Sequence, residues 1–327
     1  MQGLKNLGAT CAVNSLIQII CRNEYLRKSV LDNECNPDTL SNDLKEILDL
    51  MYNQNNSISP KKFILKLYKT FEGFFRLGEQ LDIAELWMVL HDKFCSEYGI
   101  SINSNNIEIK HPNISTENNK QISQSQEIVS YCNYTIDKIN NNKISKWQNI
   151  SQGILLNMTT CSCCKKVLYN FEPFINIPID VIDNANVVSM FKEYLSPRSC
   201  EGDWYCEHCK ERTKYLKRVK IWKMPKVLIF LIKRFNENFS KNNSSININD
   251  KICIKKGSIL NNMSNDFNYE LSSVALHYGN LHGGHYCSIC KTDEEYYLYD
   301  DLNVTKINDD FCKNNREAYM VIYSKVI

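Results

Sequence analysis

Apolar residues recur at helical spacing along the first part of the chain. The run Ser-Leu-Ile-Gln-Ile-Ile predicts a helix from Asn14 to about Cys21. A further helix is expected after Pro60, and another over 82–95, which starts with Asp82, where the helix dipole favours a carboxylate. A stripe that predicts one more amphipathic helix consists of Leu40, Leu44, Ile47, Leu48 and Met51. Residues 1–100 are therefore expected to form a helical lobe.

The pattern changes in the second half of the chain, where short apolar or alternating runs predict β-strands. The strand candidates are 167–177, 219–222, 226–234, 269–278, 286–290, 296–299 and 318–323. Residues 101–149 are rich in Asn, Ser, Gln, Lys and Ile with little apolar periodicity, and we interpret them as a polar surface insertion of uncertain order. Residues 236–250 form a second polar insertion.

Composition limits the classes of function. With 39 basic and 37 acidic residues the 327-residue chain carries a formal charge of only +2, so we expect neither nucleic acid nor a membrane as a partner. The longest apolar run, 227–232, is too short to span a bilayer. Fifteen cysteines and an N-terminus without the features of a signal peptide favour an intracellular protein whose thiols serve metal binding or catalysis. The expected compartment is cytoplasm or nucleus, in the host cell if the protein is viral, as the Asn-, Lys- and Ile-rich composition allows.

Cys11 stands directly before the first predicted helix. A helix N-terminus favours the thiolate, so we expect the pKa of Cys11 to be lowered. A thiol that attacks an amide needs a base, and the base needs a carboxylate that orients it. His285 lies at the entrance of a strand and Asp300 follows the short strand 296–299, so a hairpin between these strands could bring imidazole and carboxylate together. Taken singly, the three residues fit an inert buried thiol, a structural histidine and a turn aspartate better than a catalytic role, and only their combination favours catalysis.

Two Cys-x-x-Cys knuckles form a second constellation, at residues 161–164 and 206–209. Four thiolates complete the tetrahedral coordination of a structural Zn²⁺ ion. The expected ligands are Cys161, Cys164, Cys206 and Cys209, with Cys163 and His208 as less favoured alternatives. A redox function is weaker, because neither knuckle stands between a strand and a helix as a thioredoxin motif does.

Several motifs in order resemble those of the ubiquitin-specific protease (ubiquitin carboxyl-terminal hydrolase) family, from Gly3 to Tyr323. They are Gly3-Leu-Lys-Asn-Leu-Gly-Ala-Thr-Cys11 with Asn14-Ser-Leu-Ile-Gln18 (cysteine box), Gln80-Leu-Asp82-Ile-Ala-Glu85 (Gln-Gln-Asp element), 226–235 (central strand), and His277-Tyr-Gly279 with Gly284-His285-Tyr286, Tyr299-Asp300-Asp301 and Val304 (histidine box). The chain departs from the family at Ala12, Val13 and Leu81, where an aromatic residue, Met and Gln are common. These departures put substrate fit and turnover in doubt, not the nucleophile.

The resemblance implies an α+β, papain-like cysteine protease fold in a single catalytic domain, 1–327. It implies a helical thumb over 1–100, zinc-stapled β fingers over 150–215 and a β palm over 216–327. The polar insertions 101–149 and 236–250 interrupt this plan.

The resemblance also implies the roles of individual residues. Catalysis is assigned to Cys11 as nucleophile, His285 as base, Asp300 as its orienter, Asn6 as oxyanion donor and Asp301 as assistant or substitute for Asp300. Substrate binding is assigned to Gln80, Asp82, Glu85, Gly284 and Tyr286, with Asp82 and Glu85 as a clamp for the basic tail of ubiquitin. A helix-capping aspartate and a solvated glutamate explain the last pair equally well.

The implied activity is that of a deubiquitinating thiol hydrolase that acts through an acyl-enzyme on ubiquitin and ubiquitinated proteins. Two alternatives remain open. One is a protease for another ubiquitin-like modifier, and the other is a catalytically silent ubiquitin-binding scaffold.

Overall fold

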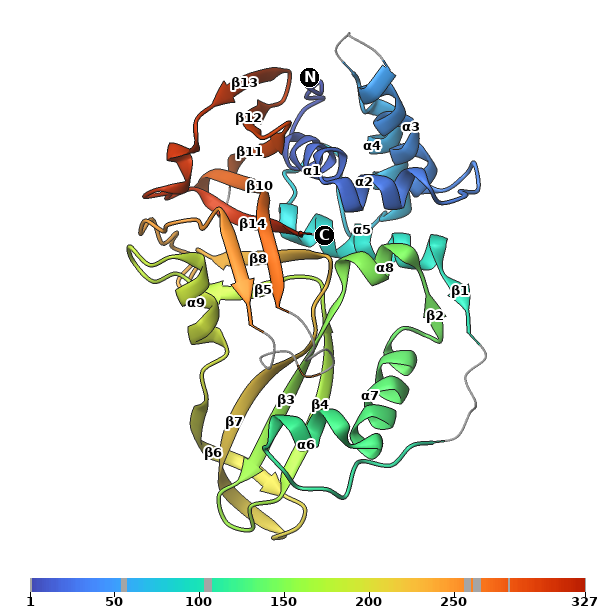
Figure 1. The fold of residues 1–327 in the computed structure, drawn as a ribbon. Helices are drawn as coiled ribbons and strands as arrows, with labels where there is room; N and C mark the ends of the chain where they lie inside the picture. Colours follow the sequence, from blue (N-terminus) through green and yellow to red (C-terminus); the bar gives the residue numbers. More distant parts are fainter. Residues whose placement is uncertain are drawn as a thin grey trace.

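The computed structural model describes residues 2–53, 58–102, 108–255, 260, 266–281 and 283–326. Within them, most of the helices gather at one corner of the molecule, beside a large sheet, and a second sheet extends away from both (Figure 1). The predicted α+β class is confirmed. No helix in the described part of the chain is long and apolar enough to cross a membrane.

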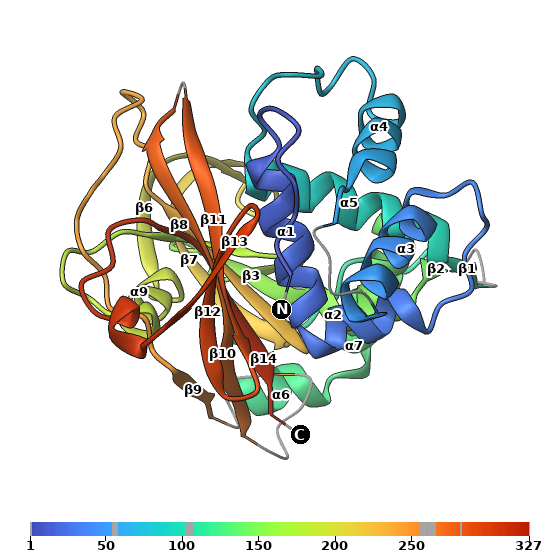
Figure 2. The same ribbon diagram turned by 90° about the horizontal axis from the view of Figure 1, so that it is seen from above.

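The thumb consists of a central helix, α1, and the helices that pack around it. Its elements are α1 (Cys11–Arg22), α2 (Glu24–Leu31), α3 (Leu40–Asn53), α4 (Lys61–Thr70), α5 (Ile83–Tyr98) and α8 (Lys146–Ser151). Figure 2 shows α1 between the palm strands and the other thumb helices. Helix α1 is buried along nearly its whole length, and it packs against α2, α5 and the palm strands β10 and β11. Its apolar side chains, such as Leu16 and Ile20, therefore join thumb and palm in one core.

The palm is one sheet in the strand order β13-β12-β11-β10-β14-β8-β5, with β9 paired to β10. All its pairs are antiparallel except β5 with β8. Its strands are β5 (Ile177–Asp180), β8 (Val227–Lys233), β9 (Lys251–Ile254), β10 (Phe267–Asn280), β11 (Gly283–Thr292), β12 (Glu295–Asp300), β13 (Asn303–Ile307) and β14 (Ala318–Lys325). Helix α9 (Val187–Tyr194) and the 3₁₀ helix η1 (Asp309–Cys312) pack against the palm core. The predicted strand 226–234 is the buried strand β8.

The fingers are a four-stranded antiparallel sheet in the order β4-β3-β7-β6. Its strands are β3 (Gly153–Cys161), β4 (Val167–Phe174), β6 (Arg198–Cys206) and β7 (Glu211–Lys223). The predicted strand 167–177 is in fact divided between the fingers and palm, because β4 ends at Phe174 and β5 begins at Ile177.

The first polar insertion contains two helices that pack on the fingers. It contains α6 (Asn119–Gln124) and α7 (Gln126–Ile139), and the short strands β1 (Ile100–Ser101) and β2 (Lys143–Ile144) pair at its base. Ile122, Ile128 and Cys132 are buried on the fingers sheet against side chains that include Tyr169 and Trp222. A few well-spaced apolar residues therefore suffice to pack this polar segment onto the fingers.

The second polar insertion, residues 236–250, is tied down by a buried arginine at the end of β8. The Arg234 guanidinium donates hydrogen bonds to the carbonyls of Asn242, Ser244, Asn315 and Ala318, at 2.7–3.2 Å. Ile246 and Ile248 of the insertion are buried in the palm core. The insertion therefore contributes to palm packing.

Candidate active site

His285 and Asp300 meet across the hairpin formed by β11 and β12. His285 Nε2 lies 2.6 Å from Asp300 Oδ1, a distance typical of a charge-assisted hydrogen bond. The two side chains are 41% and 44% exposed, so a substrate can reach the pair. The predicted hairpin is therefore present and brings imidazole and carboxylate together.

Cys11 is the first residue of α1 and is only 4% exposed. Its thiol accepts the backbone N–H of Tyr286, the residue that follows His285. The thiol is thus placed beside the start of β11, where His285 lies.

The expected lowering of the Cys11 pKa is wrong for this arrangement. Burial raises the pKa above its ordinary value and is the largest cause; the N–H groups of Tyr286, Ala12 and Cys11 itself lower it, and the charge of Asp301 raises it. The thiol is therefore neutral near pH 7.

Asp301 binds the segment that carries the nucleophile. Its Oδ2 accepts Asn6 Nδ2 at 2.8 Å, its Oδ1 accepts Asn14 Nδ2 at 2.7 Å, and its carbonyl accepts Leu4 N–H at 2.8 Å. Asn6 Oδ1 in turn accepts N–H from Gly8 and both N–H and O–H from Thr10. Asn6 is therefore held rigidly, and Asp301 acts on Asn6 and Asn14 rather than on His285.

Gln80 and Gly284 are joined by two hydrogen bonds. Gln80 Nε2 donates to the Gly284 carbonyl at 2.7 Å, and Gly284 N–H donates to Gln80 Oε1 at 2.8 Å. A Cβ on Gly284 would come within 2.4 Å of His277 Nε2 and within 2.3 Å of the Tyr278 carbonyl. Glycine is therefore required at position 284 by its close packing against β10.

Asp82 is the N-cap of α5. Its Oδ1 accepts the N–H groups of Ala84 and Glu85, and its Oδ2 accepts the hydroxyls of Tyr286 (3.1 Å) and Tyr319 (2.7 Å). Tyr286 is only 6% exposed, whereas Glu85 is exposed. The capping interpretation of Asp82 matches this geometry, and Glu85 is the carboxylate of the pair that faces solvent.

The four predicted zinc ligands converge at the tip of the fingers. The sulfur atoms of Cys161, Cys164, Cys206 and Cys209 all lie within 4.8 Å of one another. The two knuckles share one backbone geometry: Lys165 N–H donates to the Cys161 carbonyl and Lys210 N–H to the Cys206 carbonyl, and both lysines have positive φ. The cluster fits a tetrahedral zinc site.

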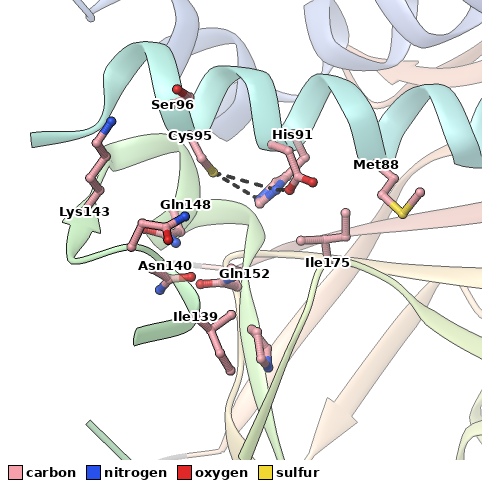
Figure 3. A pocket seen from close by; sticks show the side chains of 13 residues that line it. Met88, His91, Cys95, Ser96, Ile139, Asn140, Lys143, Gln148, Gln152 and Ile175 are labelled. Atoms are coloured by element: carbon pink, nitrogen blue, oxygen red, sulfur yellow. Dashed lines mark hydrogen bonds and ion pairs between the residues drawn. The ribbon is translucent and has the colours of Figure 1, made fainter. Parts of the chain in front are cut away.

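A second cysteine–histidine contact lines a cavity of about 540 Å³ between α5, α8 and β4 (Figure 3). Cys95 Sγ lies 3.7 Å from both ring nitrogens of His91, so it is in line with neither lone pair. Burial raises the pKa of Cys95 to about 12. This contact therefore lacks the geometry and the ionisation of a catalytic pair.

Three residues that the sequence analysis gave no role lie at the site: Asn14, Tyr319 and Cys287. Asn14 stands one helical turn after Cys11, a spacing that could have indicated a shared partner. Cys287 stands two residues after His285, a spacing that places both side chains on one face of a strand. Tyr319 approaches the site only through strand pairing, which the sequence alone does not show.

The chain matches the profile of the ubiquitin carboxyl-terminal hydrolase family over residues 2–323. It is 26% identical to ubiquitin carboxyl-terminal hydrolase 12 of Salmo salar, covering 98% of this chain and 88% of the relative. It is 25% identical to ubiquitin carboxyl-terminal hydrolase 4 of Arabidopsis thaliana (99% and 93%), and 24% identical to that of Saccharomyces cerevisiae S288c, of which the match spans only 39%.

Among solved structures, the fold is similar to that of the SAGA Ubp8/Sgf11/Sus1/Sgf73 deubiquitinating module bound to ubiquitin aldehyde. The TM-score is 0.74 at 20% identity, over all of this chain and 70% of the matched chain. A second structure of this module, bound to monoubiquitin, gives 0.73 at 19% identity, over all of this chain and 69% of the matched chain.

The family match over nearly the whole chain, together with the fold and the cysteine–histidine site, defines the class of protein as a thiol hydrolase. The chain belongs to the ubiquitin carboxyl-terminal hydrolase family of cysteine-type deubiquitinases.

Proposed function

We propose that this chain cleaves the isopeptide or peptide bond after the C-terminal glycine of ubiquitin, with Cys11, His285 and Asp300 as catalytic triad. The observation that carries the proposal is the 2.6 Å contact between His285 and Asp300, in the hairpin whose Tyr286 N–H reaches the thiol of Cys11. An orienting carboxylate, a base and a thiol nucleophile are the groups that acyl transfer needs.

In this mechanism His285 acts first as base and then as acid. Asp300 is hydrogen-bonded to Nε2 of His285, which leaves Nδ1 free to take the proton from the neutral thiol of Cys11 as its sulfur attacks the carbonyl carbon of the terminal glycine. The imidazolium then gives that proton to the departing lysine amine, and a thioester remains on Cys11. Water, deprotonated by His285, hydrolyses the thioester and restores the free thiol.

The oxyanion is stabilised by the backbone N–H of Cys11 and by the side-chain amide of Asn6. Asp301 accepts one N–H of that amide, so the second N–H can point to the developing charge. One such donor stabilises a transition state by about 3 kcal/mol. Asp301 thus supports Asn6 in this proposal.

The four cysteines at the tip of the fingers are the ligands of a structural zinc ion in our proposal. Zinc supplies a crosslink between the β3–β4 turn and the β6–β7 turn. Both turns also carry exposed lysines, among them Lys165 and Lys210, but an ammonium group does not bind a cation. The four thiolates are therefore the groups that would hold the metal.

Ubiquitin is the proposed substrate. The matched module was solved with ubiquitin aldehyde and with monoubiquitin. In this chain the exposed Glu85 can bind the basic C-terminal tail of ubiquitin. Asp82 holds Tyr286 and Gln80 holds Gly284, the two residues on either side of His285.

Hydrolysis of fluorogenic conjugates made from ubiquitin and from other Gly-Gly-tailed modifiers tests the proposal. We expect turnover of the ubiquitin conjugate by wild type and a loss of at least about 10³-fold in His285→Ala, whose base is missing. If only the conjugate of another modifier were hydrolysed, that modifier and not ubiquitin would be the substrate. Equal rates for wild type and His285→Ala would refute the triad.

A further inference from the structure

Cys287 lies next to His285 and Asp300, the proposed base and the carboxylate that orients it. The ladder between β11 and β12 has Ser288 opposite Tyr299, so the next residues, Cys287 and Asp300, face each other. His285 precedes Cys287 by two positions on β11 and therefore points to the same side of the sheet. A sulfur, a ring nitrogen and a carboxylate oxygen of these three residues all lie within 4.8 Å of one another.

The surroundings make Cys287 a hydrogen-bond donor. Its side chain is only 4% exposed, whereas that of Asp300 is 44% exposed. Burial first, and then the charge of Asp300 together with a hydrogen bond to it, raise the pKa of Cys287 to about 12. The thiol therefore keeps its proton at every pH at which the enzyme works, and the carboxylate of Asp300 is the acceptor beside it.

We propose that Cys287 is a positioning residue of the triad, whose S–H group donates to Asp300 and fixes the carboxylate in the orientation that holds His285. The inference rests on the proposed function, because it requires His285 to act as base. A carboxylate held only by the imidazole can rotate, since nearly half of it faces solvent. A second donor from the buried side removes that freedom.

The position of His285 acts on the chemical step. An imidazole that is held less firmly lies less often in line with the thiol and with the leaving amine, so removal of the S–H group lowers kcat and leaves KM unchanged.

The competing explanation is that Cys287 only fills space in the palm, as a small apolar residue. Three variants separate the explanations. Cys287→Ala removes the donor, Cys287→Ser keeps one, and Cys290→Ala removes a buried thiol from the opposite face of the same strand. The melting temperature of each variant reports its packing cost independently of activity.

The experiment measures kcat and KM with a ubiquitin fluorogenic conjugate, together with adduct formation with a tail-reactive ubiquitin probe. We expect Cys287→Ala to lower kcat by about 3- to 10-fold at unchanged KM. Cys287→Ser should restore kcat, and Cys290→Ala should leave it unchanged.

Two outcomes contradict the proposals separately. Wild type that neither turns over the conjugate nor forms an adduct would refute the proposed function. Active wild type, with a Cys287→Ala variant that has the same kcat, would refute only the role of Cys287. A Cys287→Ser variant as impaired as the alanine variant would do so as well.

Discussion

Replacing Asp301 with Asn tests how the site controls its nucleophile. Asp301 has a φ of +50°, a conformation that Asn tolerates well, so the change removes a charge with little backbone strain. The carboxylate accepts one hydrogen bond from Asn6 and one from Asn14. The new amide keeps one acceptor oxygen and turns its NH₂ group toward a donor, so one of these two bonds is lost.

The structure gives the size of both consequences. Asn14 is 2% exposed, so an unpaired amide there would destabilise the fold by about 1–3 kcal/mol, whereas Asn6 is exposed and water replaces its partner at a smaller loss. The remaining acceptor oxygen therefore stays on Asn14, and the bond to Asn6 is the one that is lost. The charge of Asp301 raises the pKa of Cys11, so its removal lowers that pKa. Turnover nevertheless falls, by about 10-fold, because Asn6 is no longer held for the oxyanion.

The assays are urea unfolding, ubiquitin-conjugate turnover, and the pH dependence of Cys11 alkylation followed by mass spectrometry. Asp293→Asn is the matched control, because Asp293 has the same φ of +50° in the turn at the other end of β12. Alkylation in Asp301→Asn should begin at lower pH than in wild type. An unchanged or raised thiol pKa, or full turnover, would refute this account of Asp301.

Three further changes test other parts of the molecule. Cys206→Ser should reduce bound zinc, measured by elemental analysis, from about one ion per chain and lower the melting temperature, whereas Cys163→Ser should not; equal zinc in both would reject the ligand assignment. Gln80→Ala loses both bonds to Gly284 and should lower kcat/KM by about 10-fold, whereas the neighbouring Glu79→Ala should not; equal effects would show that the two bonds between Gln80 and Gly284 have no role in turnover. Ile128→Ala should lower the free energy of unfolding by about 2–4 kcal/mol, because Ile128 is fully buried, and Ile139→Ala, exposed on the same helix, should change it little; a similar small loss in both would mean that the insertion does not stabilise the fingers.

The helices and the central palm strands could be predicted because their patterns are local. The apolar stripe of α3 and the continuous apolar run of β8 each require only neighbouring residues. Strand β3 was missed because it is buried over most of its length on both sides and shows no alternation, and β6 was missed because it is polar and short of apolar residues. Helix α7 was missed because it lies in a stretch dominated by Asn, Ser, Gln and Lys, although Ile128, Cys132 and Ile136 recur at helical spacing and Ser125 provides its N-cap.

The site could be predicted as far as sequence motifs place residues on one hairpin or one loop. His285 and Asp300 belong to adjacent strands, so their contact follows from a short connection. The pKa of Cys11 could not be predicted, since it depends on burial beneath β11, and neither could the pairing of Asp82 with Tyr319, 237 positions away. Cys287 acquires its neighbour through the register of β11 and β12.

The central claim is tested most directly by covalent capture of Cys11. Zinc-loaded wild type and Cys11→Ala are incubated with ubiquitin that carries a thiol-reactive group at its C-terminus, and intact masses are measured. We predict a one-to-one adduct with wild type and none with Cys11→Ala. Folded wild type that forms no adduct, or Cys11→Ala that forms the same adduct, would contradict the assignment of this chain as a ubiquitin hydrolase that acts through Cys11.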